Sequence, residues 1–291
     1  MARDDDRDPL GAGKAFADLS FWRKIEVAGR DAFEWLNDLV SADLDGLEPG
    51  TARQSLLLSP TGRIRAAFAV TRLQPDVLLL IQDPTQPRPI DGLLEPYVLS
   101  SNVELADRTE AFTLLAFPGL VRPPSAPAGV WLSPGSLGRG VDLLAPIERH
   151  DKAVGFAEGH FEGVGAEEVE RWRVLAGIPR FGVDALEEDL PQEGGLAEAI
   201  SFDKGCYLGQ EAVAKVRNLG HPRRVVMAME TEDPVSPGDV IVMDGNDAGR
   251  VTSAARLADR TVLLASIRWD GRGGPLRTKE GAELITTRPL P

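Results

Sequence analysis

The only cysteine of the chain, Cys206, lies in the run Lys-Gly-Cys-Tyr-Leu-Gly-Gln-Glu at residues 204–211. A thiol acts as a nucleophile or metal ligand in its thiolate form, which nearby cations and helix N-termini favour. Lys204 stands two positions before Cys206, Gly205 allows a turn with positive φ, and Gly209 precedes a helical pattern. We therefore predict that Cys206 is a reactive thiol and that Lys204 and the helix start favour its thiolate. The alternative is a buried cysteine that packs as a small hydrophobe.

Basic side chains gather around this run although the whole chain has a formal net charge of -13. The segment 204–224 contains the single acid Glu211 and five basic residues, namely Lys204, Lys215, Arg217, Arg223 and Arg224. A cationic segment of this kind suits an anionic ligand, since Arg pairs well with carboxylates. The alternative is a set of solvated surface cations. The acidic total argues against a nucleic-acid or membrane-surface binder, both of which usually present a basic face.

The run at 204–211 resembles the K-G-C-Y-x-G-Q-E signature of the YgfZ proteins, which are folate-binding relatives of the glycine-cleavage T-protein. Four further segments look like landmarks of the wider family, at residues 29–37, 59–64, 173–182 and 191–196. Their order and spacing agree with the family, and together they cover the chain from about residue 20 to its end. The resemblance implies an α+β fold with T-protein-like folate-binding α/β domains and a small C-terminal β-barrel.

The resemblance also implies a ligand, tetrahydrofolate or a derivative, and residues that meet it. Tyr207, Gln210 and Glu211 would order the loop or contact the ligand, and Arg217 would meet its anionic tail. Many relatives place a glutamate against the pterin ring where this chain has Leu175. The pterin contact would then come from another acid, such as Glu193 or Glu198.

A second departure concerns the carboxylate that T-proteins use in aminomethyl transfer, shortly after the glycine that corresponds to Gly62. Here residues 63–68 read Arg-Ile-Arg-Ala-Ala-Phe, and no acid occurs between Glu48 and Asp76. Stabilising charge in a transition state needs a positioned charge or dipole, which alanine does not supply. Classical aminomethyltransferase activity is therefore not expected.

We accordingly interpret the chain as a folate-binding accessory protein of the YgfZ type. Such proteins support the assembly or repair of iron–sulfur enzymes, including those used in tRNA modification. Cys206 would bind or exchange with a cluster iron as a transient ligand, or attack a one-carbon unit on folate. One alternative is a folate-dependent aminomethyl or one-carbon transferase of the T-protein type, and a second is a non-catalytic scaffold that has lost folate binding. The expected partners are folate and iron–sulfur enzymes or their assembly proteins, without membrane or direct nucleic-acid binding.

The pattern along the chain predicts three parts: a disordered tail at 1–14, a folate-binding α+β region at 15–220, and a β-barrel at 221–291. Pro and Gly mark a subdomain at about 112–165. Helices are predicted at 31–40, before 99, at 166–176 and from 210 to 217. Strands are predicted at the ranges 55–58, 64–73, 77–81, 103–105, 112–117, 130–132, 141–144, 225–229, 240–243, 251–254, 262–267 and 284–287.

Other features narrow the class of protein. A single cysteine allows no internal disulfide, which fits a reducing cytoplasm. The charged N-terminus lacks the apolar core of a signal peptide, and no apolar run approaches the ~20 residues that span a bilayer. His150 and His160 have no ligand cluster at metal spacing, so no metal site is predicted. No nucleotide-binding glycine motif is present.

Overall fold

The computed structural model describes residues 8–99, 101–125 and 129–289. The chain divides into two compact units that exchange segments along the sequence. Unit 1 consists of Met1–Leu57, Arg65–Trp172 and Asp203–Leu208. Unit 2 consists of Leu58–Ile64, Arg173–Phe202 and Gly209–Pro291.

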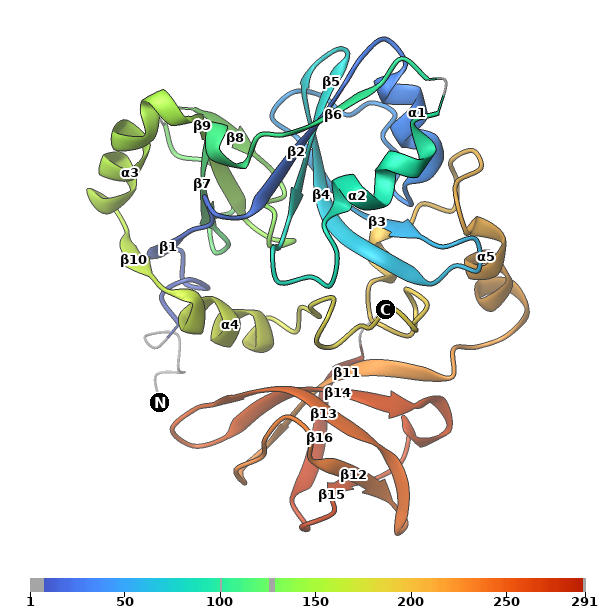
Figure 1. The fold of residues 1–291 in the computed structure, drawn as a ribbon. Coiled ribbons are helices and arrows are strands. Elements are labelled where there is room, and N and C mark those ends of the chain that lie inside the picture. The colour runs from blue at the N-terminus through green and yellow to red at the C-terminus, as the bar shows by residue number, and fades with distance from the viewer. Residues whose placement is uncertain (1–7, 100, 126–128, 290–291) are drawn as a thin grey trace. The chain divides into compact units, whose positions relative to one another are not determined.

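Unit 1 contains two five-stranded sheets (Figure 1). The first has the order β10-β1-β7-β9-β8, with a parallel pair between β10 and β1 and antiparallel pairs elsewhere. Its strands are β1 (Ala15–Asp18), β7 (Phe112–Phe117), β8 (Val130–Leu132), β9 (Val141–Pro146) and β10 (Glu162–Val164). The second has the order β3-β4-β5-β2-β6, and its strands are β2 (Arg23–Ala28), β3 (Ala52–Leu58), β4 (Ile64–Gln74), β5 (Val77–Gln82) and β6 (Glu104–Asp107).

The helices are α1 (Ala32–Leu39), α2 (Ile90–Leu94), α3 (His150–Glu158), α4 (Ala166–Leu175) and α5 (Gln210–Leu219). Helices α1, α2 and α3 of unit 1 bury apolar faces against these sheets. In α1 the spacing of Ala32 and Leu36 puts both side chains on one face, and both are buried in the core of the second sheet. Ala153 and Ala157 of α3 pack in the same way against the first sheet. A further cluster combines residues of both sheets, including Leu79 and Leu114.

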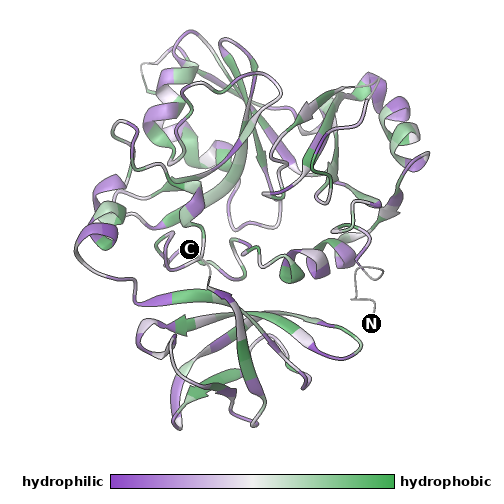
Figure 2. Ribbon diagram, turned by 180° about the vertical axis from the view of Figure 1, so that it is seen from behind, coloured by the Kyte–Doolittle hydropathy of each residue, from purple (hydrophilic) through white to green (hydrophobic). Residues whose placement is uncertain are grey.

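Unit 2 contains a closed barrel with the strand order β11-β14-β13-β12-β15-β16. Figure 2 shows apolar and polar segments alternating along its strands, as expected where one face is buried. The interior holds side chains such as Met229, Ile241 and Leu263. The strands are β11 (Arg224–Thr231), β12 (Val240–Met243), β13 (Asn246–Arg256), β14 (Thr261–Arg268), β15 (Leu276–Thr278) and β16 (Glu283–Pro289).

Short 3₁₀ helices join several of these elements. They are η2 (Glu95–Tyr97), η3 (Thr109–Ala111), η4 (Ile147–Arg149), η5 (Ala197–Ala199) and η6 (Trp269–Gly271).

The predicted fold class is confirmed: mixed α/β sheets precede a small C-terminal barrel. Helix α5 begins at Gln210 as predicted, and α4 ends just before Gly177, whose φ of 65° is left-handed. Strands β1, β2, β10 and β15 and helix α3 were not predicted. Where described, no helix is both long and apolar enough to cross a membrane.

The predicted disordered tail is wrong for its second half. Leu10 is only 1% exposed, and main-chain hydrogen bonds join Lys14 to Pro9 and Ala12 to Asp8. A buried leucine fixes this turn, which a charged flanking sequence does not reveal. Residues 1–7 of the predicted tail lie outside the described residues.

Candidate functional site

The Cys206 loop of unit 1, residues 203–208, is fixed on both sides of an exposed thiol. Leu208 packs against the core cluster that includes α1, and Tyr207 is buried at 6% exposure. Cys206 itself is exposed and free, and among the described residues it makes no hydrogen bond. The alternative of a buried cysteine is therefore wrong. An anchored loop presents the thiol to solvent, where another molecule can reach it.

Lys204 anchors the loop by closing the end of α1. Its Nζ donates to the carbonyl oxygens of Asn37, Val40 and Ala42, the last two at 3.0 and 2.8 Å, and to Asn37 Oδ1 at 2.9 Å. The last carbonyls of a helix have no partner within it, and a cation there also favours the helix dipole. Helix α1 has no basic residue in its own last turn, so Lys204 supplies that charge.

These contacts give Lys204 a role that was not predicted, and its effect on the thiol stays a prediction. Its ammonium is bonded to four oxygens of the α1 end and makes no hydrogen bond with Cys206 among the described residues. The structure thus gives Lys204 a positioning role for the loop. Burial, only partly offset by the charges of Asp43, Asp38 and Asp45, lowers the pKa of Lys204 to about 8.

Tyr207 carries an unsatisfied hydroxyl. Its Oη is buried and makes no hydrogen bond within the described part of the chain. Burial raises the pKa of Tyr207 to about 12, so the phenol stays neutral and able to donate. The ammonium of Lys204 lies 5.5 Å from the ring centroid. A buried donor without a partner is costly and indicates a place for a ligand or water.

The sharp turn of the signature run is made by Gly209 and not by Gly205. Gly209 has a φ of 82° at the N-cap of α5, whereas Gly205 does not have a positive φ. A Cβ at Gly209 would lie 2.4 Å from the carbonyl oxygen of Ser59, and at Gly205 it would meet no atom within 4 Å. The prediction of a positive φ at Gly205 is therefore wrong, and the thiol lies four residues before the first residue of α5.

Helix α5 carries three of the predicted ligand residues in unit 2. Glu211 and Arg217 are exposed, and Gln210 is partly exposed at the first position of the helix. The guanidinium carbon of Arg217 lies 4.1 Å from the ring centroid of Phe202, a cation–π contact that leaves its donors available. These positions are open to a ligand, and their predicted roles remain proposals.

Glu193 is buried in a double ion pair of unit 2. One carboxylate oxygen accepts from Arg63 at 3.0 Å and the Leu190 amide at 2.9 Å. The other accepts from the amide and Nε of Arg223, both at 3.2 Å. Burial alone would raise the pKa of Glu193, but these hydrogen bonds and the Arg223 charge outweigh it and lower the pKa. The predicted pterin contact is corrected accordingly: both oxygens already hold the protein together.

The segment after Gly62 contains no acidic side chain, and its two alanines lie among uncharged groups. Ala66 is fully buried in the core of unit 1. The side chain of Gln86 pairs with the main chain of Ala67, through an N–H···O bond of 3.1 Å to its Oε1 and one of 2.6 Å from its Nε2. A second buried amide, Gln82, donates to Gln86 at 3.1 Å. An amide network, which sequence analysis missed, therefore occupies this strand edge and brings no carboxylate.

Leu175, at the position of the family's pterin-contacting glutamate, packs in unit 2 with Val174, Leu257 and Val262. Its side chain therefore contributes to packing. Searched over the described residues, the chain has no cluster of three or more potential metal ligands. Sequence analysis also missed a pocket on the barrel lined by four arginines, although Arg223 and Arg224 were noted as part of the basic segment.

Comparison with known proteins supports the fold described above. Residues 12–124 match the model of the GCVT N-terminal domain. The aminomethyltransferase T of the glycine cleavage system from Bartonella henselae superposes with a TM-score of 0.78 at 20% identity, covering 97% of this chain and 88% of that one.

The curated relatives named here are 25–26% identical to this chain. The "Putative transferase At1g60990, chloroplastic" of Arabidopsis thaliana is 26% identical over 86% of this chain, which spans 64% of the length of that relative. An uncharacterized protein of Haemophilus influenzae is 25% identical over 83% of this chain and 85% of its own length. An aminomethyltransferase of Streptomyces coelicolor is 25% identical over 82% of this chain and 73% of its own length. The chain thus has the fold of an aminomethyltransferase T-protein and begins with a segment similar to the GCVT N-terminal domain.

Proposed function

We propose that this protein is a folate-binding accessory protein of the YgfZ type, which supports the assembly or repair of iron–sulfur enzymes in the cytoplasm. These enzymes include ones that modify tRNA. One observation carries the proposal. In a T-protein fold, the strand edge after Gly62 holds Ala66 and the neutral Gln86 amide where aminomethyl transfer needs a carboxylate.

The residues of unit 1 fit a folate ligand in one respect. The buried hydroxyl of Tyr207 has no partner in the described structure, and a pterin ring offers the nitrogen and carbonyl acceptors that such a donor needs. Arg217, on α5 of unit 2, has free donors for a carboxylate tail. Tetrahydrofolate or a derivative, when bound, would supply a one-carbon carrier.

Cys206 supplies the second part of the proposal. Lys204 and Leu208 fix the loop, and the exposed thiol between them can reach a protein partner. Its Sγ would release its proton to solvent and bind an iron of the cluster transiently, the cluster being the cargo. The partners would be iron–sulfur enzymes or their assembly proteins, without direct nucleic-acid binding.

A complementation experiment tests this function. In cells that lack this protein, the product of an iron–sulfur enzyme that modifies tRNA is quantified after return of the wild type, Cys206→Ala or Asp203→Ala. Asp203 is exposed in the same loop and is the matched control. We expect the wild type and Asp203→Ala to restore the modification and Cys206→Ala to fail. Full restoration by Cys206→Ala would rule out the thiol as the working group.

The T-protein reaction is the second candidate, and the similarity to an aminomethyltransferase of Streptomyces coelicolor supports it. It predicts turnover when the purified protein receives a carrier-borne aminomethyl group and tetrahydrofolate, the one-carbon unit passing to the folate and the nitrogen leaving as ammonia. We expect no turnover above the rate without protein, because Ala66 and Ala67 offer no charge to the reacting centre.

A further inference from the structure

Three arginines lie close together on neighbouring strands of the barrel in unit 2. In the antiparallel register Arg224 of β11 lies opposite Arg268 of β14, and Arg250 of β13 lies opposite Ser266 of β14. Like charges directly opposite each other on antiparallel strands are destabilising. Within the described residues Arg224 makes no hydrogen bond or ion pair that would relieve this repulsion. The sheet therefore keeps a cation whose guanidinium group makes no hydrogen bond to the described residues, although the charge of Asp189 lies within its electrostatic reach.

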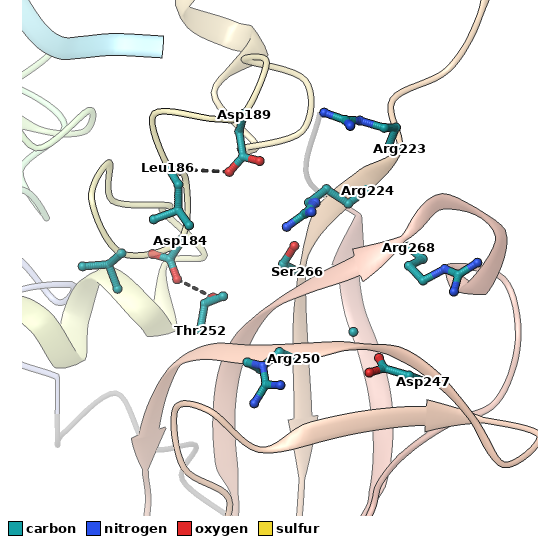
Figure 3. A pocket seen from close by; sticks show the side chains of 12 residues that line it. Asp184, Leu186, Asp189, Arg223, Arg224, Asp247, Arg250, Thr252, Ser266 and Arg268 are labelled. Carbon is teal, nitrogen blue, oxygen red and sulfur yellow. Dashed lines mark hydrogen bonds between the residues drawn. The ribbon is translucent and has the colours of Figure 1, made fainter. Parts of the chain in front are cut away.

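These side chains border a pocket of about 350 Å³ whose other wall is the segment 183–189 of the same unit. Figure 3 shows Arg224 pointing into the space between Asp189 and Ser266, with Arg250 below it and Arg268 to its right, both directed away from Arg224. The wall is tied to the barrel because Asp184 accepts hydrogen bonds from Thr252 at 2.6 Å and from Ser253 at 2.7 Å. The pocket is thus held open by structure within one unit.

The lining of the pocket is strongly charged. Four arginines and three aspartates line it. One of the three, Asp184, is neutralised by the buried Arg173 at 2.6 Å. Acids outside the lining also pair with two of the arginines, Glu193 with Arg223 and Asp270 with Arg268, so Arg224 and Arg250 are left beside Asp189 and Asp247.

The hydrogen bonds and ion pairs of the lining arginines do not use all of their N–H groups. Arg223 is bonded to Glu193, and Arg268 makes an exposed pair with Asp270 at 3.2 Å. Arg250 uses one N–H on the carbonyl oxygen of Gly238, and a guanidinium has five. Arg224 uses none on the described residues. Ser266 also makes no side-chain hydrogen bond in the described structure.

We propose that this pocket binds a small oxyanion, the phosphate or carboxylate group of a polar metabolite, with Arg224, Arg250 and Ser266 as donors. Guanidinium groups match both anions through paired hydrogen bonds. Asp189 has one oxygen bonded to the Leu186 amide and a second that is free to accept from a hydroxyl or amino group of the same ligand. The volume is at the lower end of the range for small-molecule sites, which favours a metabolite over a macromolecule.

Calorimetric titration of the full chain with inorganic phosphate, and separately with succinate, tests the proposal at constant ionic strength set by chloride. Arg224→Ala is compared with Arg277→Ala, an exposed barrel arginine that pairs with Glu283 away from the pocket. We expect wild type and Arg277→Ala to bind one of the anions equally, and Arg224→Ala to bind about tenfold more weakly. The anion that binds more tightly identifies the ligand group.

The melting temperature without anion separates binding from folding. Because Arg224→Ala removes the repulsion with Arg268, we expect it to melt no lower than the wild type. Ser266→Ala provides a second variant with a smaller loss of affinity. Equal affinity in wild type and Arg224→Ala would overturn the proposal. So would the absence of binding to the wild type at about 10 mM of either anion.

Discussion

Replacing Lys204 with methionine should destabilise the end of α1 by about 2–4 kcal/mol. The wild-type ammonium donates to four oxygens of residues 37–42. A hydrogen bond to a charged group contributes about 1.5–3 kcal/mol, and three N–H groups can be used at once. Burial of the ammonium opposes this gain and lowers the pKa of Lys204 to about 8. The cost is at most ~3 kcal/mol, and it is smaller because the side chain is partly solvated.

Methionine fills a similar volume but leaves the carbonyls of Asn37, Val40 and Ala42 without this donor. Hydrogen exchange measured by mass spectrometry on peptides that cover residues 32–44 gives the free energy of local opening directly. Lys215→Met is the matched control, since Lys215 is exposed on α5 and makes no hydrogen bond within the described residues. A change below about 1 kcal/mol in Lys204→Met, or an equal change in the control, would refute the anchoring role.

Two further predictions concern stability. Asp142 is 1% exposed, and burial raises its pKa to about 6 from an ordinary 3.8. The folded state therefore favours the protonated acid. The stability that this protonation contributes is complete below about pH 4 and is lost as the pH rises through 6. The free energy of unfolding of Asp142→Asn, measured by urea titration, should therefore rise relative to the wild type by up to about 3 kcal/mol between pH 4 and 7. A difference that does not depend on pH would contradict the raised pKa. Gly209→Ala should lower the melting temperature measured by circular dichroism, because its φ of 82° and the contact with Ser59 strain any side chain. Gly205→Ala, with open space around it, should leave the melting temperature unchanged, and equal losses in both variants would argue against the turn at Gly209.

Local pattern was enough to predict much of the fold. The start of α5 follows from Gly209 and the run after it, and short β-rich runs separated by Pro and Gly turns indicated the barrel. Strand β2 was missed because its sequence, Arg-Lys-Ile-Glu-Val-Ala, is rich in charge. Lys24 in it is fully buried, and its Nζ donates to the carbonyl oxygens of Ser20 and Trp22 at 2.7 and 2.9 Å. Only the folded structure supplies those acceptors.

The candidate site was less predictable because its contacts join distant parts of the chain. Lys204 donates to residues 162 to 167 positions away, and its sequence neighbours could not reveal these partners. Glu193 is held by Arg63 and Arg223, which lie on opposite sides of it in sequence. Sequence spacing cannot assign the partners of a side chain that has several possible ones. The thiol of Cys206 could be selected as a candidate because of its unusual flanking residues.

Titration of tetrahydrofolate into the purified protein by calorimetry tests the central claim most directly. Wild type, Cys206→Ala and Tyr207→Phe are run in parallel. We predict equal affinity for the wild type and Cys206→Ala, because the exposed thiol serves the partner and not the pterin. Tyr207→Phe should bind about fivefold more weakly, since it loses one hydrogen bond. The titrations use concentrations that detect an affinity of roughly 100 μM. No heat of binding with any of the three proteins would contradict folate binding and favour the alternative of a scaffold that has lost its ligand.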